Sequence, residues 1–103
     1  MTEAQFRVGV AADGTTPVVA ASGDIDLANV PQFQDALTRA AEGSAVLTVD
    51  LTAVNYCDSA AVRALFSVAA ATDLTMIVSS TGPIITLLGI SGLDRVATVV
   101  ARE

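Results

Sequence analysis

The sequence predicts a single α/β domain with a mixed sheet of about five strands, an antiparallel hairpin at one edge, β-α crossovers and three main helices. Short runs rich in β-branched residues alternate with segments of helical apolar spacing, which is the pattern of βαβ units. Two strand-like runs stand side by side near the N-terminus, separated by a turn signal. The 103 residues suit one domain over residues 1–103, with no room for a second.

The N-terminal hairpin is predicted from alternation and turn chemistry. Apolar residues alternate with polar or small ones over Gln5–Ala11, which is the period of a half-buried strand. Asp13-Gly14 is a turn signal, and Pro17–Ser22 supplies the second strand. We therefore expect the two segments to pair antiparallel.

The first helix and the central strand follow the hairpin. Residues 23–27 are expected to lead into a helix with Asn29 as N-cap, Pro31 in the first turn and an end at Gly43. Ala45–Leu51 is a short apolar run that predicts a buried central strand. Residues 54–58 are expected to connect this strand to the next helix.

The second half repeats the strand–helix alternation. A helix from Ser59 to about Thr72 is predicted, followed by a buried strand over Leu74–Val78. The third helix should run from the turn at residues 79–83 to about Ile90, and the last strand over Val96–Val100. The expected apolar face of the second helix consists of Val62, Leu65, Phe66 and Ala69.

The third helix has apolar residues at too many angles for a single face. Burial of most of these side chains is the simpler interpretation. Partial exposure as a contact surface is the alternative.

Composition excludes several classes of function. Eleven acidic residues outnumber five scattered arginines, so a nucleic-acid partner is not expected, because phosphate binding needs clustered basic residues. The chain has no histidine and no lysine, which removes the usual zinc sites, Ser-His-Asp triads and Ser-Lys nucleophiles. We therefore expect no enzyme activity, no metal and no cofactor.

The sequence also predicts a cytoplasmic protein without a membrane segment. No apolar run approaches the roughly 20 residues of a membrane helix, and the N-terminus lacks the pattern of a signal peptide. The single cysteine, Cys57, can form no internal disulfide and is expected to be a small buried residue in a reducing compartment.

Asp58-Ser59 is the most informative local feature. A serine in the first turn of a helix lies near unpaired backbone N–H groups and the positive end of the helix dipole, where a phosphate would be tolerated. On local chemistry alone the ordinary alternative is stronger, because Asp and Ser are common N-caps.

Three motifs in order resemble the STAS family of bacterial anti-sigma factor antagonists (anti-anti-sigma factors). Ser22–Ala28 (SGDIDLA) is similar to the segment after the family's second strand. Val49–Ser59 (VDLTAVNYCDS) is similar to the segment that leads to its phosphorylated serine. Gly82–Val96, with GPI and SGLDRV at its ends, is similar to the third-helix signature. The resemblance covers almost the whole chain and implies the STAS (SpoIIAA-like) fold.

The resemblance implies a partner-switching cycle that regulates sigma-factor-dependent transcription. The unphosphorylated protein would bind an anti-sigma factor that is also a serine kinase, phosphorylation of Ser59 would end the binding, and a serine phosphatase would restore it. ATP would belong to the kinase. Arg63, one helical turn beyond Ser59, could pair with a partner carboxylate or with the phosphate, or could simply be a solvated arginine. The partner-binding residues implied are Asp24, Asp26, Asp58, Ser59, Ala60, Val62 and Arg63.

The chain departs from the family pattern in two places. Ala60 and Ala61 stand where the family commonly has a hydroxyl residue and a glycine, which leaves Ser59 as the only phosphoacceptor of the motif. The family also usually carries a final helix, whereas only residues 101–103 follow the last predicted strand.

Two other functions remain open from the sequence. The domain could instead sense a nucleotide or a small anion without being phosphorylated. It could also be a scaffold module in which Ser59 is only a helix cap.

Overall fold

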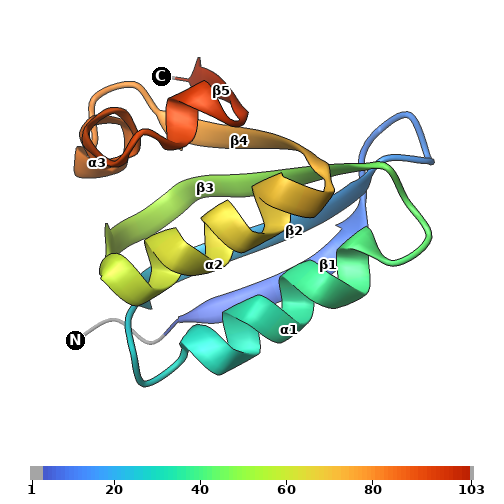
Figure 1. Ribbon diagram of the computed structural model, residues 1–103, viewed down its shortest axis with the longest axis horizontal. Helices are drawn as coiled ribbons and strands as arrows, with labels where there is room; N and C mark the ends of the chain where they lie inside the picture. The colour runs from blue at the N-terminus through green and yellow to red at the C-terminus, as the bar shows by residue number, and fades with distance from the viewer. Residues whose placement is uncertain (1–3, 103) are drawn as a thin grey trace.

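The computed structural model describes residues 4–102 (Figure 1). The helices and strands alternate in the predicted order. They are β1 (Gln5–Val10), β2 (Pro17–Ile25), α1 (Val30–Ala41), β3 (Val46–Cys57), α2 (Ser59–Ala71), β4 (Asp73–Ser79), α3 (Pro83–Ser91), the short 3-10 helix η1 (Leu93–Arg95) and β5 (Thr98–Arg102).

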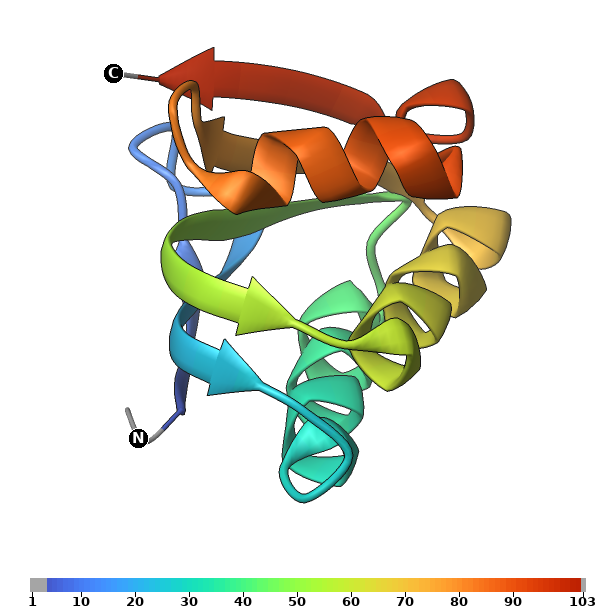
Figure 2. The same cartoon turned by 90° about the vertical axis from the view of Figure 1, so that its left-hand side faces the viewer.

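The five strands form one mixed sheet in the order β1-β2-β3-β4-β5. β1 pairs antiparallel with β2, and every later neighbour is parallel, so the predicted edge hairpin and crossovers are confirmed. Helices α1 and α2 contact each other and cover one face of the sheet, whereas α3 packs on β3 and β4 (Figures 1 and 2). Parallel strands place their carboxyl ends at one edge, and α1 and α2 begin there.

A single apolar cluster lies between the sheet and the helices. Phe33 and Leu37 of α1 and Leu65 of α2 are fully buried against Val49 of β3 and Met76 of β4. Burial alternates along β4, as expected for strands whose one face meets the helices. In the part of the chain described, no polar or charged residue is fully buried.

β2 and β3 are longer than predicted. Residues 23–25 belong to β2 rather than to a lead-in to α1, and residues 54–57 belong to β3 rather than to a connection. The pairing of these two strands shifts between Ala20 and Ser22 and again between Gly23 and Asp24, and Gly23 has φ 84°. Such bulges interrupt the alternation of apolar residues, so the sequence pattern looks like a loop there.

The remaining differences concern the second helix and the last strand. The buried face of α2 is Ala61, Ala64, Leu65 and Val68, whereas the predicted Val62, Phe66 and Ala69 are only half-buried. Three of the four buried positions carry small or β-branched side chains, which let the helix approach the sheet closely. β5 begins two residues later than predicted, because η1 occupies residues 93–95. None of the helices within residues 4–102 combines the length and the apolar character needed to span a membrane.

Candidate partner-binding site around Ser59

Asp58 joins two loops at the carboxyl end of the sheet. One carboxylate oxygen accepts hydrogen bonds from the N–H groups of Ala60 (2.9 Å) and Ala61 (3.2 Å), which is the geometry of a helix N-cap. The other oxygen accepts from the N–H of Leu27 (2.9 Å), 31 residues earlier in the chain. The Asp58 N–H also donates to the carbonyl of Ile25 (3.1 Å). A single aspartate therefore caps α2 and holds the β2–α1 loop beside it.

Ser59 is the first residue of α2 and is exposed. Its hydroxyl takes part in none of the side-chain hydrogen bonds found among residues 4–102. Asp58 rather than Ser59 caps the helix, so the serine hydroxyl is not occupied by a structural role. It stands at the helix N-terminus, where the dipole favours negative charge.

The end of β2 and the loop that follows it carry two further carboxylates, those of Asp24 and Asp26. Asp24 is paired with Tyr56 across β2 and β3, so the residues that follow each strand lie side by side. Asp26 accepts a hydrogen bond from the N–H of Ala28 (3.0 Å). Asn29 occupies the predicted N-cap position of α1, but its side chain makes no cap. Instead it accepts from the N–H of Asp26 (3.1 Å) and donates to the carbonyl of Asp24 (2.9 Å), which fixes the loop.

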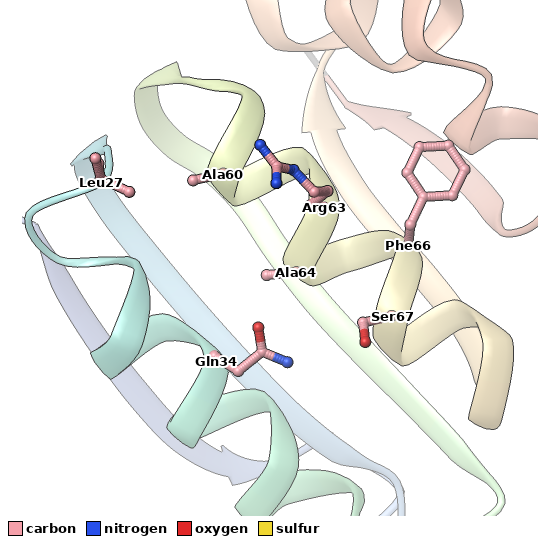
Figure 3. A pocket seen from close by; sticks show the side chains of 7 residues that line it. All are labelled: Leu27, Gln34, Ala60, Arg63, Ala64, Phe66 and Ser67. Atoms are coloured by element: carbon pink, nitrogen blue, oxygen red, sulfur yellow. The ribbon is translucent and has the colours of Figure 1, made fainter.

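A shallow groove of about 580 Å³ runs between α1 and α2 beside this loop (Figure 3). Arg63 is the only charged side chain that lines this groove. The one ion pair found within residues 4–102 joins Arg39 to Asp35 (3.1 Å). Arg63 therefore pairs with no carboxylate among these residues. Gln34 of α1 points across the groove toward α2 (Figure 3). The lining residues are Leu27, Gln34, Ala60, Arg63, Ala64, Phe66 and Ser67.

Exposed apolar side chains are found in the loop held by Asp58, at the end of β3 and on α3. Leu27 is 74% exposed in the loop held by Asp58, and Ile90 of α3 is 80% exposed. Tyr56, half-exposed, comes three residues before Ser59. A second groove of about 280 Å³ lies between the end of β3 and α3. It is lined by Asn55, Tyr56, Cys57, Pro83, Ile84, Thr86, Leu87 and Ile90.

Sequence analysis did not identify Leu27 and Tyr56. Leu27 could have been found as a large apolar residue in the stretch of residues 23–27, which the sequence predicts to lead into the first helix. The exposure of Tyr56 has no local signal, because it depends on the register shifts of β2 against β3. For α3, the expectation of burial holds for Ile84 and Leu88, and the expectation of partial exposure holds for Ile90.

Cys57 lies directly under this surface but is not available for chemistry. It is buried, and desolvation raises its pKa from 9.0 to about 12, with a smaller contribution from the nearby Asp58 carboxylate. The thiolate needed for metal binding or oxidation is therefore strongly disfavoured, which agrees with the expectation of a small buried residue.

Most of the expected partner-binding residues gather at one end of the molecule. Ala60 and Arg63 line the α1–α2 groove, Asp24 lies near the end of β2, and Asp26 lies on the loop that Asp58 holds. Val62 differs, because it packs against the apolar core. Within residues 4–102, this end of the molecule combines carboxylates, an arginine that forms no ion pair, the exposed side chain of Leu27 and a serine hydroxyl that makes no hydrogen bond.

The fold belongs to a class already seen in crystal structures. An anti-sigma factor antagonist from Mycobacterium paratuberculosis is similar with a TM-score of 0.85 at 22% identity, over 97% of this chain and 87% of that one. A putative anti-sigma factor antagonist from Thermotoga maritima gives a TM-score of 0.75 at 15% identity, over 94% and 86%. The anti-sigma factor antagonist SpoIIAA in its unphosphorylated form gives 0.67 at 14%, over 96% and 90%. At these identities the likeness establishes a shared fold.

The chain belongs to the family described as Mlab, STAS domain, whose model matches residues 8–101. The matched range reaches from β1 to β5, so the STAS fold predicted from the three motifs is confirmed. A search of curated proteins returned no match.

Proposed function

We propose that this STAS domain is an anti-sigma factor antagonist that binds an anti-sigma factor through the surface around Ser59. Phosphorylation of Ser59 by the anti-sigma factor, acting as a serine kinase, ends the binding, and a serine phosphatase restores it. The protein acts as a ligand and a kinase substrate in the cytoplasm of a bacterium, and not as an enzyme. Three solved structures of similar fold are described as anti-sigma factor antagonists, one of them putative, which supports this role.

The observation that carries the proposal is that Asp58 caps α2 whereas the Ser59 hydroxyl stays exposed. Asp58 caps α2 through its carboxylate, so the exposed hydroxyl of Ser59 can be modified without loss of the cap. A phosphate on the first residue of the helix would face the positive end of the helix dipole. The modified protein would therefore keep its fold while its surface changes charge.

The electrostatic effect of the phosphate is large enough for a switch. A phosphoserine adds about −1.5 to −2 charges to a protein of net charge −6, next to Asp58 and at the end of the sheet that carries Asp24 of β2 and Asp26 of the following loop. Two unit charges about 4 Å apart interact by about 1 kcal/mol in water and about 4 kcal/mol at an effective dielectric of about 20. Repulsion of a partner carboxylate by a few kcal/mol corresponds to a loss in affinity of about 100-fold or more.

The test combines phosphorylation mapping with binding measurements. Incubation with a candidate anti-sigma kinase and ATP should place one phosphate on Ser59, as read by mass spectrometry. Ser59→Ala should bind the partner with wild-type affinity, and Ser59→Asp should bind at least about tenfold more weakly. Thr15→Asp is the matched control, because Thr15 is exposed in the β1–β2 turn at the opposite end of the strands. Equal affinity of all three variants would contradict the charge switch.

Sensing of a small anion is the second candidate function, because Arg63 lines the α1–α2 groove and pairs with no carboxylate of residues 4–102. A titration with inorganic phosphate or a nucleotide, followed by NMR, should then shift the signals of Ala60, Arg63 and Ser67. Arg63→Gln should abolish these shifts. Under the antagonist proposal, the titration leaves the spectrum unchanged.

A further inference from the structure

β1 forms an edge of the sheet, and its outer side has no partner strand among residues 4–102. Edge strands in natural proteins usually carry bulges, prolines or charged side chains that prevent pairing with another chain. The register of β1 against β2 is unbroken from Gln5 to Val10, and β1 contains no proline. Its single charged residue, Arg7, alternates with the apolar residues and so lies on the other face.

The free backbone groups of this edge belong to the apolar residues. The N–H of Ala11 donates to the carbonyl of Thr16 (2.8 Å), which makes these two residues a hydrogen-bonded pair of the hairpin. Hydrogen-bonded and non-hydrogen-bonded pairs alternate along an antiparallel ladder. Arg7 and Gly9 therefore direct their backbone groups to β2, whereas Phe6, Val8 and Val10 direct theirs outward.

The same three residues form an apolar row on the helix face. Phe6 packs against Phe33 of α1, with ring centroids 5.3 Å apart. Val8 is 53% exposed and Val10 is 63% exposed, although α1 also contacts β1, β2 and β3. The helix thus covers the start of β1 and leaves its second half open, next to an unpaired strand edge.

This edge is complementary to itself. When two copies pair antiparallel with Val8 opposite Val8 of the second copy, Phe6 meets Val10 in each half. All of these are residues with outward backbone groups, and each pair exchanges two hydrogen bonds. On the other face Arg7 meets Gly9 of the second copy rather than another arginine, and the space beside Gly9 is empty within 4 Å of an added Cβ.

We propose that β1 is a dimerisation edge, which pairs with β1 of a second copy of this chain and continues the sheet across a two-fold axis. Side chains, backbone hydrogen bonds and charges all match in one register, which favours a second copy over an unrelated peptide. Ser59 follows β3, two strands away from this edge, so the pairing uses a surface distinct from the proposed partner site. The inference is therefore independent of the proposed function.

Sedimentation equilibrium of the whole chain tests the proposal directly. An interface of one short strand pair is small, so we expect a reversible monomer–dimer equilibrium with a dissociation constant on the order of 100 µM. The decisive variant is Val8→Pro, because the lost N–H points away from β2 and the hairpin keeps its hydrogen bonds. It should weaken dimerisation at least about tenfold. Val8→Thr, which retains the N–H and the β-branched shape, should still dimerise, and circular dichroism should show all three proteins folded.

Amide hydrogen exchange gives the register independently. With rising protein concentration, the amides of Phe6, Val8 and Val10 should become protected, whereas those of Arg7 and Gly9, already bonded to β2, should not change. A wild-type chain that stays monomeric up to about 1 mM would overturn the proposal. A dimer that Val8→Pro leaves intact would also overturn it. So would a series of trimers and larger oligomers, because such a series indicates head-to-tail pairing of β1 with β5 of the next copy.

Discussion

Replacement of Asp58 by alanine should destabilise the protein, because this carboxylate makes two separate structural contacts at the carboxyl end of the sheet. The change removes the N-cap of α2, which costs about 1 kcal/mol, with a range of about 0.5 to 2. It also removes the acceptor of the Leu27 N–H, which costs about 1 kcal/mol more. The free energy of unfolding should fall by about 2 kcal/mol, and Tm by about 8 to 16 °C for a domain of this size.

A graded series separates the two contributions. Asp58→Ser keeps a capping oxygen but is too short to reach Leu27, so it should cost about 1 kcal/mol. Asp35→Ala is the matched control, because it removes a carboxylate whose ion pair with Arg39 is exposed and contributes less than about 0.5 kcal/mol. Urea unfolding followed by circular dichroism measures all three. If Asp58→Ser costs no more than Asp35→Ala, the link between the two loops is not stabilising and our reasoning fails. If Asp58→Ala costs no more than Asp58→Ser, the capping oxygen contributes nothing beyond the link.

Three further predictions concern the surface, the thiol and the hairpin turn. Ile90→Asp should weaken partner binding at least about tenfold. Because the Ile90 side chain is 80% exposed, Tm should stay within about 2 °C of the wild-type value. An unchanged affinity in a binding titration would show that α3 is not part of the interface. Cys57 should react with a thiol reagent at about pH 8 far more slowly in the folded protein than in urea, since burial raises its pKa to about 12; equal rates would disprove its burial. Hydrogen bonds from Thr16 and Thr15 hold the pKa of Asp13 at about 2, below 3.8, so this carboxylate stabilises the fold above about pH 4 and the contribution is lost as the pH falls toward 2. Urea midpoints of Asp13→Asn and wild type should therefore converge in acid, and a constant difference would contradict the assignment.

Most of the fold could be predicted from local patterns. The turn at Asp13-Gly14, the helix start near Pro31 and the helix ends near Gly43 and Gly92 were all recognisable, because turn and cap residues act within a few positions of the chain. The parallel order of β2 to β5 followed from alternation of strands and helices. The three motifs located Ser59 at the start of a helix, where the structure has it.

The candidate site was predictable only in part. The sequence could not separate Asp58 from Ser59 as the cap, since either residue can fill that position. The structure decides for Asp58, through two backbone hydrogen bonds within α2. Leu27 and Tyr56 entered the site for a different reason, because their positions depend on how β2 is registered against β3.

The sequence by itself determined the order of the elements, the hairpin at the edge and the place of Ser59 at the start of α2. Each of these rests on residues close together in the chain. Tertiary structure alone decided that β2 and β3 continue past their bulges, that Asp58 reaches Leu27, and that the exposed Tyr56 and Ile90 line one groove. The physical reason is that strand register and helix packing are set by contacts between segments distant in sequence, which no local pattern encodes.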